Sequence, residues 1–209
     1  MKKQHAKLPI FPLPVYLLPE GITRLRIFEP RYLKMVSLAS KEQGFVIYLT
    51  QNSTENTVKQ TSDKVWGSWV DIINFGQGSD GILEIDVKCK SLVELHSFKQ
   101  DKNKLNYANT SLLEHWATSR FNTSTKQFST KKTSTKQLLP TRLSTSLVNV
   151  INNSDILSEL YPKIPTNNTI WLIARWLEIL PIEQLAKHLF IEQYSFQQAQ
   201  EFVETILFK

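Results

Sequence analysis

Hydrophobic and polar residues alternate along much of the first half of the chain, which predicts a β-sheet. Within residues 82–89, apolar and polar side chains alternate from Leu83 to Cys89, as expected of a half-buried strand. Residues 44–50 and 65–75 are rich in β-branched and aromatic residues and also predict strands, with Gly67 marking a bulge or a close backbone approach. Residues 92–98 are expected to continue the sheet.

The first apolar run, residues 8–19, is interrupted by four prolines. Because proline has no N–H to donate to a β-ladder, we expect this run to form an edge strand or an extended crossover. A helix is expected to begin at Pro30, since the fixed φ of proline suits the first helical position and Glu29 places a carboxylate near the positive helix end. We expect this helix to bury Leu33 and Val36.

A helical period replaces the alternation in the last third of the chain. Residues 169–180 are apolar nearly all round, with Arg175 and Glu178 on one side that we expect to be exposed, as in the central helix of a small bundle. Pro181 is expected to begin another helix. Residues 196–207 carry an apolar stripe at helical spacing and predict a last amphipathic helix.

The composition is that of an ordinary globular protein, with 41% hydrophobic and 21% charged residues in a chain of 209. Residues 118–137, here called the basic insert, hold five lysines or arginines and no acid, so they supply most of the net charge of +6. Half of the insert is Ser or Thr, and this low complexity predicts disorder. We therefore expect a β-rich subdomain over 1–117, the insert as a linker, and a helical subdomain over 138–209.

Several kinds of chemistry are not indicated. Gly76, Gly78 and Gly81 match a dinucleotide-binding string, but an alternating strand follows where that motif needs a helix. No P-loop or nucleophile elbow occurs, and the four histidines share no ligand spacing with Cys89, so we expect no catalytic residues, no metal and no cofactor. A lone cysteine forms no internal disulfide, which fits a cytoplasmic protein, and no apolar run is long enough to span a membrane.

The opening of the chain closely resembles the N-terminal domain family of Lon proteases. The resemblance rests on Leu-Pro-x-Phe-Pro-Leu at 8–13, Pro-x-Gly at 19–21 and Ile-Phe-Glu-Pro-Arg-Tyr at 27–32, with Arg-x-x-Glu-x-Leu-Pro at 175–181 near the other end. It covers most of the chain apart from 99–140. It implies an α+β protein, with a PUA-like β-barrel followed by a small helical bundle.

One group of residues carries the family motif, and a second group consists of candidates for partner binding. We expect the block that opens the first helix to be mainly structural: Glu29, Pro30, Arg31 and Tyr32. Trp66 and Trp69 lie three apart on a predicted strand and therefore face opposite sides, so one should be core and the other exposed. The candidate partner-binding residues are Phe11, Tyr16, Tyr32, Trp66 and Trp69.

The resemblance implies a binding module that does no chemistry itself. We expect it to engage polypeptide segments or a protein partner through apolar grooves or an exposed sheet edge. The chain ends before the ATPase and peptidase modules that follow this domain in full Lon proteases, so we expect neither activity. An RNA or other nucleic-acid binder that uses the barrel and the lysine-rich insert is the alternative, and a small-molecule enzyme ranks third. No pattern in the sequence indicates an oligomeric state.

Overall fold

The computed structural model describes residues 6–40, 43–49, 65–118 and 135–208, and for 135–140, 184 and 185 only the backbone. The chain divides into two compact units, Met1–Glu114 and His115–Lys209. Each unit is described by itself below.

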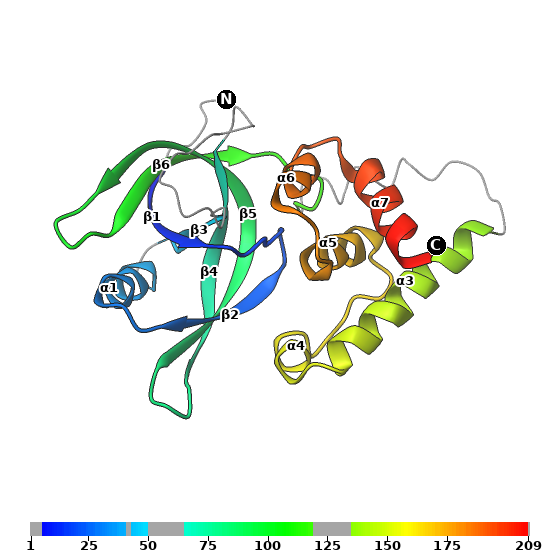
Figure 1. The fold of residues 1–209 in the computed structure, drawn as a ribbon, viewed down its shortest axis with the longest axis horizontal. Helices are drawn as coiled ribbons and strands as arrows, with labels where there is room; N and C mark the ends of the chain where they lie inside the picture. The colour runs from blue at the N-terminus through cyan, green and yellow to red at the C-terminus, as the bar shows by residue number, and fades with distance from the viewer. Residues whose placement is uncertain (1–5, 41–42, 50–64, 119–134, 209) are drawn as a thin grey trace. The chain divides into compact units, whose positions relative to one another are not determined.

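The first unit contains six strands and one helix among its described residues (Figure 1). In chain order these are β1 (Ala6–Leu13), β2 (Ile22–Ile27), α1 (Pro30–Ala39), β3 (Phe45–Leu49), β4 (Trp66–Gln77), β5 (Leu83–Gln100) and β6 (Asn106–Leu113). The predicted strands over 44–50, 65–75 and 82–98 correspond to β3, β4 and β5.

Five of the strands pair in a closed ring in the order β1, β3, β4, β5, β6 and back to β1. Only the β1–β3 pairing is parallel. β5 is long enough to serve two neighbours on one side: its first part pairs with β2 and its second part with β6. The predicted α+β class, with a barrel of strands followed by helices, is confirmed.

The expectation that the proline-rich run is an edge strand or a crossover is wrong for β1 as a whole. β1 pairs with β6 from Ala6 to Ile10 and with β3 from Ile10 to Leu13. Pro9 therefore has a partner strand only on the β6 side and Pro12 only on the β3 side. Each proline lies at a position that needs hydrogen bonds on one side only, which is where a missing N–H is tolerated.

Side chains are buried on both faces of this sheet. One buried cluster takes residues from β1, β3, β5 and β6: Leu8, Ile10, Val46, Val93, Leu95 and Ala108. Tyr48 of β3 and Trp69 of β4 pack against it. Residues of the opposite parity, such as Phe45, Ile47 and Trp66, are buried as well. Gly67 permits the close approach predicted for it, because a Cβ there would lie 2.5 Å from Cγ1 of Val46.

Helix α1 begins at Pro30 as predicted, with Glu29 as its N-cap residue. It buries Met35, Val36 and Ala39. Leu33, which we expected to be buried, is 42% exposed. The helix turns Met35 to the core in its place, and the predicted apolar face is one residue off in phase.

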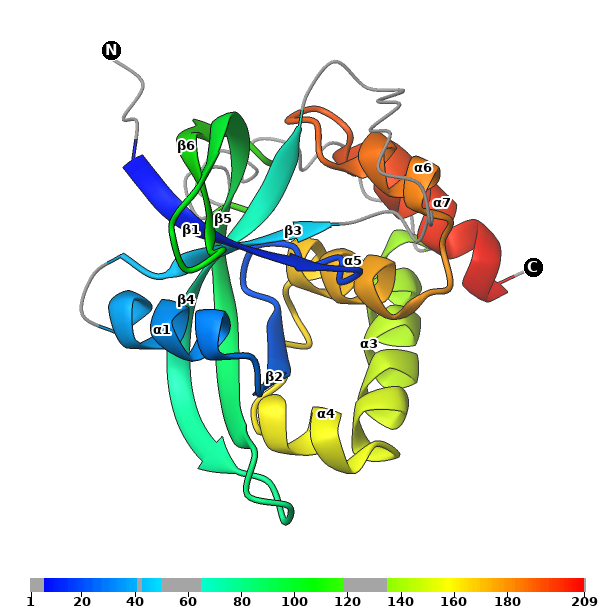
Figure 2. The same cartoon turned by 60° about the vertical axis from the view of Figure 1, so that its left-hand side comes forward.

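The second unit is helical in its described residues (Figures 1 and 2). Its elements are α3 (Thr135–Asn152), α4 (Asp155–Leu160), α5 (Thr169–Ile179), α6 (Gln184–Lys187), the 3₁₀ turn η2 (His188–Phe190) and α7 (Phe196–Phe208). Trp176 on α5 ties α5 to α3, because its Nε1 donates to the carbonyl oxygen of Leu143 at 3.2 Å.

Two expectations for this unit are wrong. Arg175 is 1% exposed and Glu178 is nearly buried, because the two charges pair with each other and so tolerate burial. The helix expected to begin at Pro181 begins only at Gln184, since the chain leaves α5 in an extended conformation at Leu180.

The basic insert lies mostly outside the described residues, and α3 begins at Thr135, inside its predicted range. The three-part division of the chain stays a prediction.

Candidate functional site

The block that opens α1 forms a chain of contacts between a carboxylate, a guanidinium and two rings. Arg31 bonds to Glu29, with Nη2 at 2.6 Å and Nε at 2.7 Å from Oε2. The guanidinium lies 4.8 Å from the centre of the Tyr32 ring, and that ring meets Phe11 edge-on at 4.5 Å. Partial burial is the main cause of the raised pKa of Tyr32. The block thus fastens the start of α1 to β1, in keeping with the structural role predicted for it.

Three of the five candidate binding residues are buried. Phe11 is 7%, Tyr16 4% and Trp66 3% exposed. Tyr16 and Trp66 meet at near right angles with ring centres 5.9 Å apart, and Phe11 packs between Tyr32 and Phe45. These side chains belong to the core and present no surface here, because large rings bury most of their area when strands and a helix converge on them. Their role in partner binding stays an untested prediction.

Trp69 faces the other way from Trp66, as predicted, and is partly buried. Its Nε1 donates to the carbonyl oxygen of Gln43 at 2.6 Å, and Nζ of Lys90 lies 4.0 Å from the ring centre. Lys90 also bonds to Asp71 at 2.6 Å. The face of this ring is occupied by a cation, so Trp69 offers at most its edge to a partner.

The outer part of β4 is an open sheet edge. β4 pairs with β3 only from Gly67 to Val70, whereas it pairs with β5 as far as Gln77. From Asp71 to Gln77 the strand therefore has one neighbour among the residues that the structure describes. The other side of this stretch, here called the β4 edge, presents backbone N–H and C=O groups that a further strand can meet. In Figure 1 this part of β4 and the start of β5 extend as a hairpin away from the ring.

The two faces of the sheet beside the β4 edge differ in polarity. On one face Leu25, Ile85 and Phe75 form a cross-strand row. Leu25 and Ile85 are buried, and Phe75 at the end of the row is 53% exposed. Ile73, at the β-bulge between Ile72 and Asn74, is 51% exposed. A strand added at the β4 edge would lie beside the end of this apolar row.

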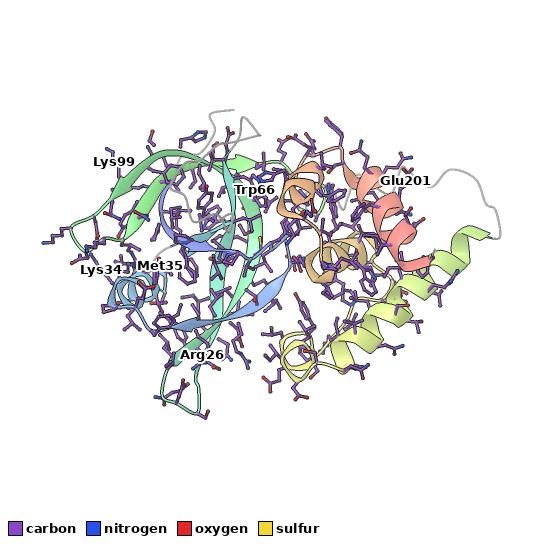
Figure 3. The ribbon with its side chains drawn as sticks, viewed as in Figure 1. Arg26, Lys34, Met35, Trp66, Lys99 and Glu201 are labelled. Atoms are coloured by element: carbon purple, nitrogen blue, oxygen red, sulfur yellow. The ribbon has the colours of Figure 1, made fainter. Side chains whose placement is uncertain are left out.

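On the opposite face the row is polar. Asp86 accepts from Arg24 at 2.7 Å and from Asn74 at 3.1 Å. The bond from Arg24 is the main reason that the pKa of Asp86 is lowered, so this carboxylate stays charged. Near the tip of the hairpin Arg26 bonds to Asp80 and lies 3.6 Å from Glu84 (Arg26 is labelled in Figure 3). These pairs hold the hairpin in shape.

A second surface lies on β1, β6 and β5, and Tyr107 is its centre. Tyr107 is paired with Pro9 on one side and with Lys99 on the other, so the three share a face. Nζ of Lys7 lies 5.0 Å from the centre of the Tyr107 ring. Figure 3 labels Lys99 on the β5–β6 hairpin and Lys34 on α1 beside it. Lys34 bonds to Asp101 at 2.8 Å. We call Lys7, Lys34, Lys99, Tyr107 and Asn109 the Tyr107 surface.

Neither surface was predicted from the sequence, because each depends on how the strands pair. The β4 edge arises because β3 stops pairing with β4 at Val70. The predicted strand over 65–75 is longer than the one over 44–50, and this difference in length was a signal of the edge. Lys7 is far from Lys99 and Tyr107 in the chain, and strand register brings the three together.

The described part of the chain contains neither a cluster of metal ligands nor a membrane-spanning helix. No group of three or more His, Cys, Asp and Glu side chains there could hold a metal ion. None of the helices described is both long and apolar enough to cross a bilayer.

Comparisons with known proteins agree on one family. A family model described as the ATP-dependent protease La (LON) substrate-binding domain matches residues 7–183. A crystal structure of a Lon N-terminal domain protein from Xanthomonas campestris aligns with a TM-score of 0.62 and 21% identity over 95% of this chain and 97% of that one. The N-terminal domain of the Mycobacterium avium complex Lon protease aligns with a TM-score of 0.57 and 9% identity, covering 96% and 97%. No curated protein sequence matches the chain.

Proposed function

Because the chain belongs to the family of Lon substrate-binding domains, we propose that it is a non-catalytic module that binds extended polypeptide segments by adding them as a strand to the β4 edge. The observation that carries this proposal is the backbone from Asp71 to Gln77, which has a paired strand on one side only among the described residues.

The edge lacks most of the features that keep sheet edges from pairing. Such edges are commonly guarded by lysine, by proline or by being very short. β4 has neither residue between Trp66 and Gln77, and its charged residue, Asp71, is held by Lys90. Within the described residues, the bulge at Ile73 is the feature that guards this edge, and it bends the strand without covering it. A long, weakly guarded edge suits a module that pairs with other chains.

The side chains on the two faces of the sheet beside the β4 edge determine which polypeptide segments fit. An apolar side chain placed opposite Phe75 would extend the row that Leu25 and Ile85 begin, and would cover a ring that is now 53% exposed. On the other face the same segment would meet Asn74 and the charged Asp86, and therefore needs polar residues at alternate positions. The preferred ligand is an unfolded segment in which apolar and polar residues alternate.

The experiment compares two phenylalanines of equal exposure. Phe75→Lys puts a charge on the β4 edge, whereas Phe98→Lys puts the same charge on the β5–β6 hairpin, where Phe98 is 50% exposed. The probe is a labelled peptide of alternating valine and threonine, and its binding is followed by fluorescence anisotropy. Covering about half of a Phe side chain contributes roughly 1–2 kcal/mol, so Phe75→Lys should weaken binding about 5- to 30-fold and Phe98→Lys should leave it unchanged.

Backbone pairing is tested with the peptide itself. The same peptide N-methylated at alternate residues keeps its side chains but cannot donate hydrogen bonds along one side, and it should bind much more weakly. Equal affinity of both peptides, or an equal loss in the two lysine variants, would contradict strand addition at this edge.

A further inference from the structure

The Tyr107 surface combines an aromatic ring with lysines that approach it from three elements. Lys7 comes from β1, Lys99 from β5 and Lys34 from α1. Lys7 lies over the ring at 5.0 Å, and Lys34 donates a hydrogen bond to Asp101 that is the main cause of its raised pKa. Lys7 thus lies over the ring, and Lys99 is the neighbour of Tyr107 in strand register.

The described acids near this surface neutralise only part of its positive charge. Asp101 is bonded to Lys34, and that bond is the main cause of a pKa lowered to about 2. Glu94 lies on the same face but is paired with Ser111, on the far side of the His96–Asn109 pair from Tyr107. The turn between β5 and β6 adds two exposed lysines, Lys102 and Lys104. The region thus keeps a positive charge that no described acid cancels.

We propose that the Tyr107 surface binds single-stranded nucleic acid: Lys7 moves from the partly exposed Tyr107 ring to a flanking phosphate, a base stacks on the ring in its place, and Lys99 holds the next phosphate. An aromatic ring on a sheet, flanked by amines, matches the repeating base and phosphate of a single strand. A duplex hides its bases from such a ring. This surface is separate from the β4 edge, and its function does not depend on peptide binding.

Binding is measured by fluorescence anisotropy with labelled oligo(U) and oligo(dT) at several salt concentrations. To remove the contribution of the basic insert, all proteins carry the full chain with R120Q, K126Q, K131Q, K132Q and K136Q. Lys7→Gln and Lys99→Gln each remove one phosphate contact, and Lys163→Gln removes an exposed lysine of the second unit as a matched control.

Each of the two Tyr107-surface variants should flatten the slope of log affinity against log salt by about 0.7, the value for one phosphate of a single strand. Lys163→Gln should leave the slope unchanged. Tyr107→Leu should weaken binding about 5- to 150-fold, as expected for the loss of one stacked base, while Tyr107→Phe keeps the ring and should bind as tightly as the parent. Because Tyr107→Phe changes the strand least, it also controls for misfolding of Tyr107→Leu.

Three results would overturn the proposal. The first is no binding of either oligonucleotide by the parent. The second is an equal effect of Lys163→Gln and Lys99→Gln. The third is that the protein binds inorganic polyphosphate or phosphatidylglycerol vesicles but not the oligonucleotides, and that Tyr107→Leu leaves this binding unchanged. That result would show a general anion-binding or lipid-binding surface.

Discussion

Removal of Glu178 alone is expected to destabilise the second unit strongly. Arg175 is 1% exposed, and its Nε and Nη2 donate to the Glu178 carboxylate at 2.6 and 2.7 Å. Glu178→Leu leaves the guanidinium buried without the carboxylate that faces it. Breaking a buried ion pair in this way costs about 3–5 kcal/mol. The guanidinium keeps its contact with the Trp171 ring, 5.3 Å away, which places the expected loss toward the lower part of that range.

The double variant separates the net contribution of the pair from the cost of an unpaired charge. Arg175→Met with Glu178→Leu removes both charges and fills the space with apolar groups of similar volume, so its stability should return to within about 1 kcal/mol of the parent or exceed it. Urea unfolding followed by circular dichroism at 222 nm reports on the helices of this unit. Glu201→Leu, on the exposed side of α7 (Figure 3), is the control and should change stability by less than about 0.5 kcal/mol. A loss under about 1 kcal/mol for Glu178→Leu, or a double variant as unstable as the single one, would refute this account of the pair.

Three further predictions concern other parts of the chain. Gly44→Ala should destabilise the first unit by roughly 1–3 kcal/mol in urea unfolding, because Gly44 has a φ of 79° and a Cβ there would overlap the carbonyl oxygen of Val70. Burial lowers the pKa of His115 from 6.5 to about 4. The unfolded chain therefore binds a proton more readily, and stability should fall as the pH is lowered from 6.5 to about 4, a slope that His115→Gln should reduce. Limited trypsin digestion, read by mass spectrometry, should cut first between Arg120 and Lys136, as the low complexity of the basic insert predicts; early cuts within β5 would contradict that prediction.

The fold could be predicted to a large extent because its signals are local. Alternation over 82–89, the proline that begins α1 and the apolar run over 169–180 each depend on a few neighbouring residues, and each corresponds to an element of the structure. The errors arose where pairing between side chains or strands decides the outcome. Arg175 is buried because Glu178 and Trp171, each one helical turn away, pair with its guanidinium. β1 accepts two prolines because its two halves have neighbouring strands on opposite sides.

The candidate sites could not be predicted from the same signals. The candidate partner-binding residues are all aromatic, but Phe11, Tyr16 and Trp66 have core positions that only their packing reveals. The sequence predicted only that Phe75 lies in a strand. Its side chain is exposed because β3 stops pairing with β4 at Val70. Strand register, which brings Tyr107 beside Lys99, is set by the whole barrel.

Hydrogen–deuterium exchange of the backbone amides of β4, with and without the alternating valine–threonine peptide, tests the central claim most directly. Strand addition predicts that the peptide slows exchange between Asp71 and Gln77, since amides that face solvent would then donate to the added strand. Amides from Gly67 to Val70, which already lie between β3 and β5, should change little. Slowed exchange confined to α1 or to the second unit, with none along the β4 edge, would contradict the proposal that this edge binds polypeptides.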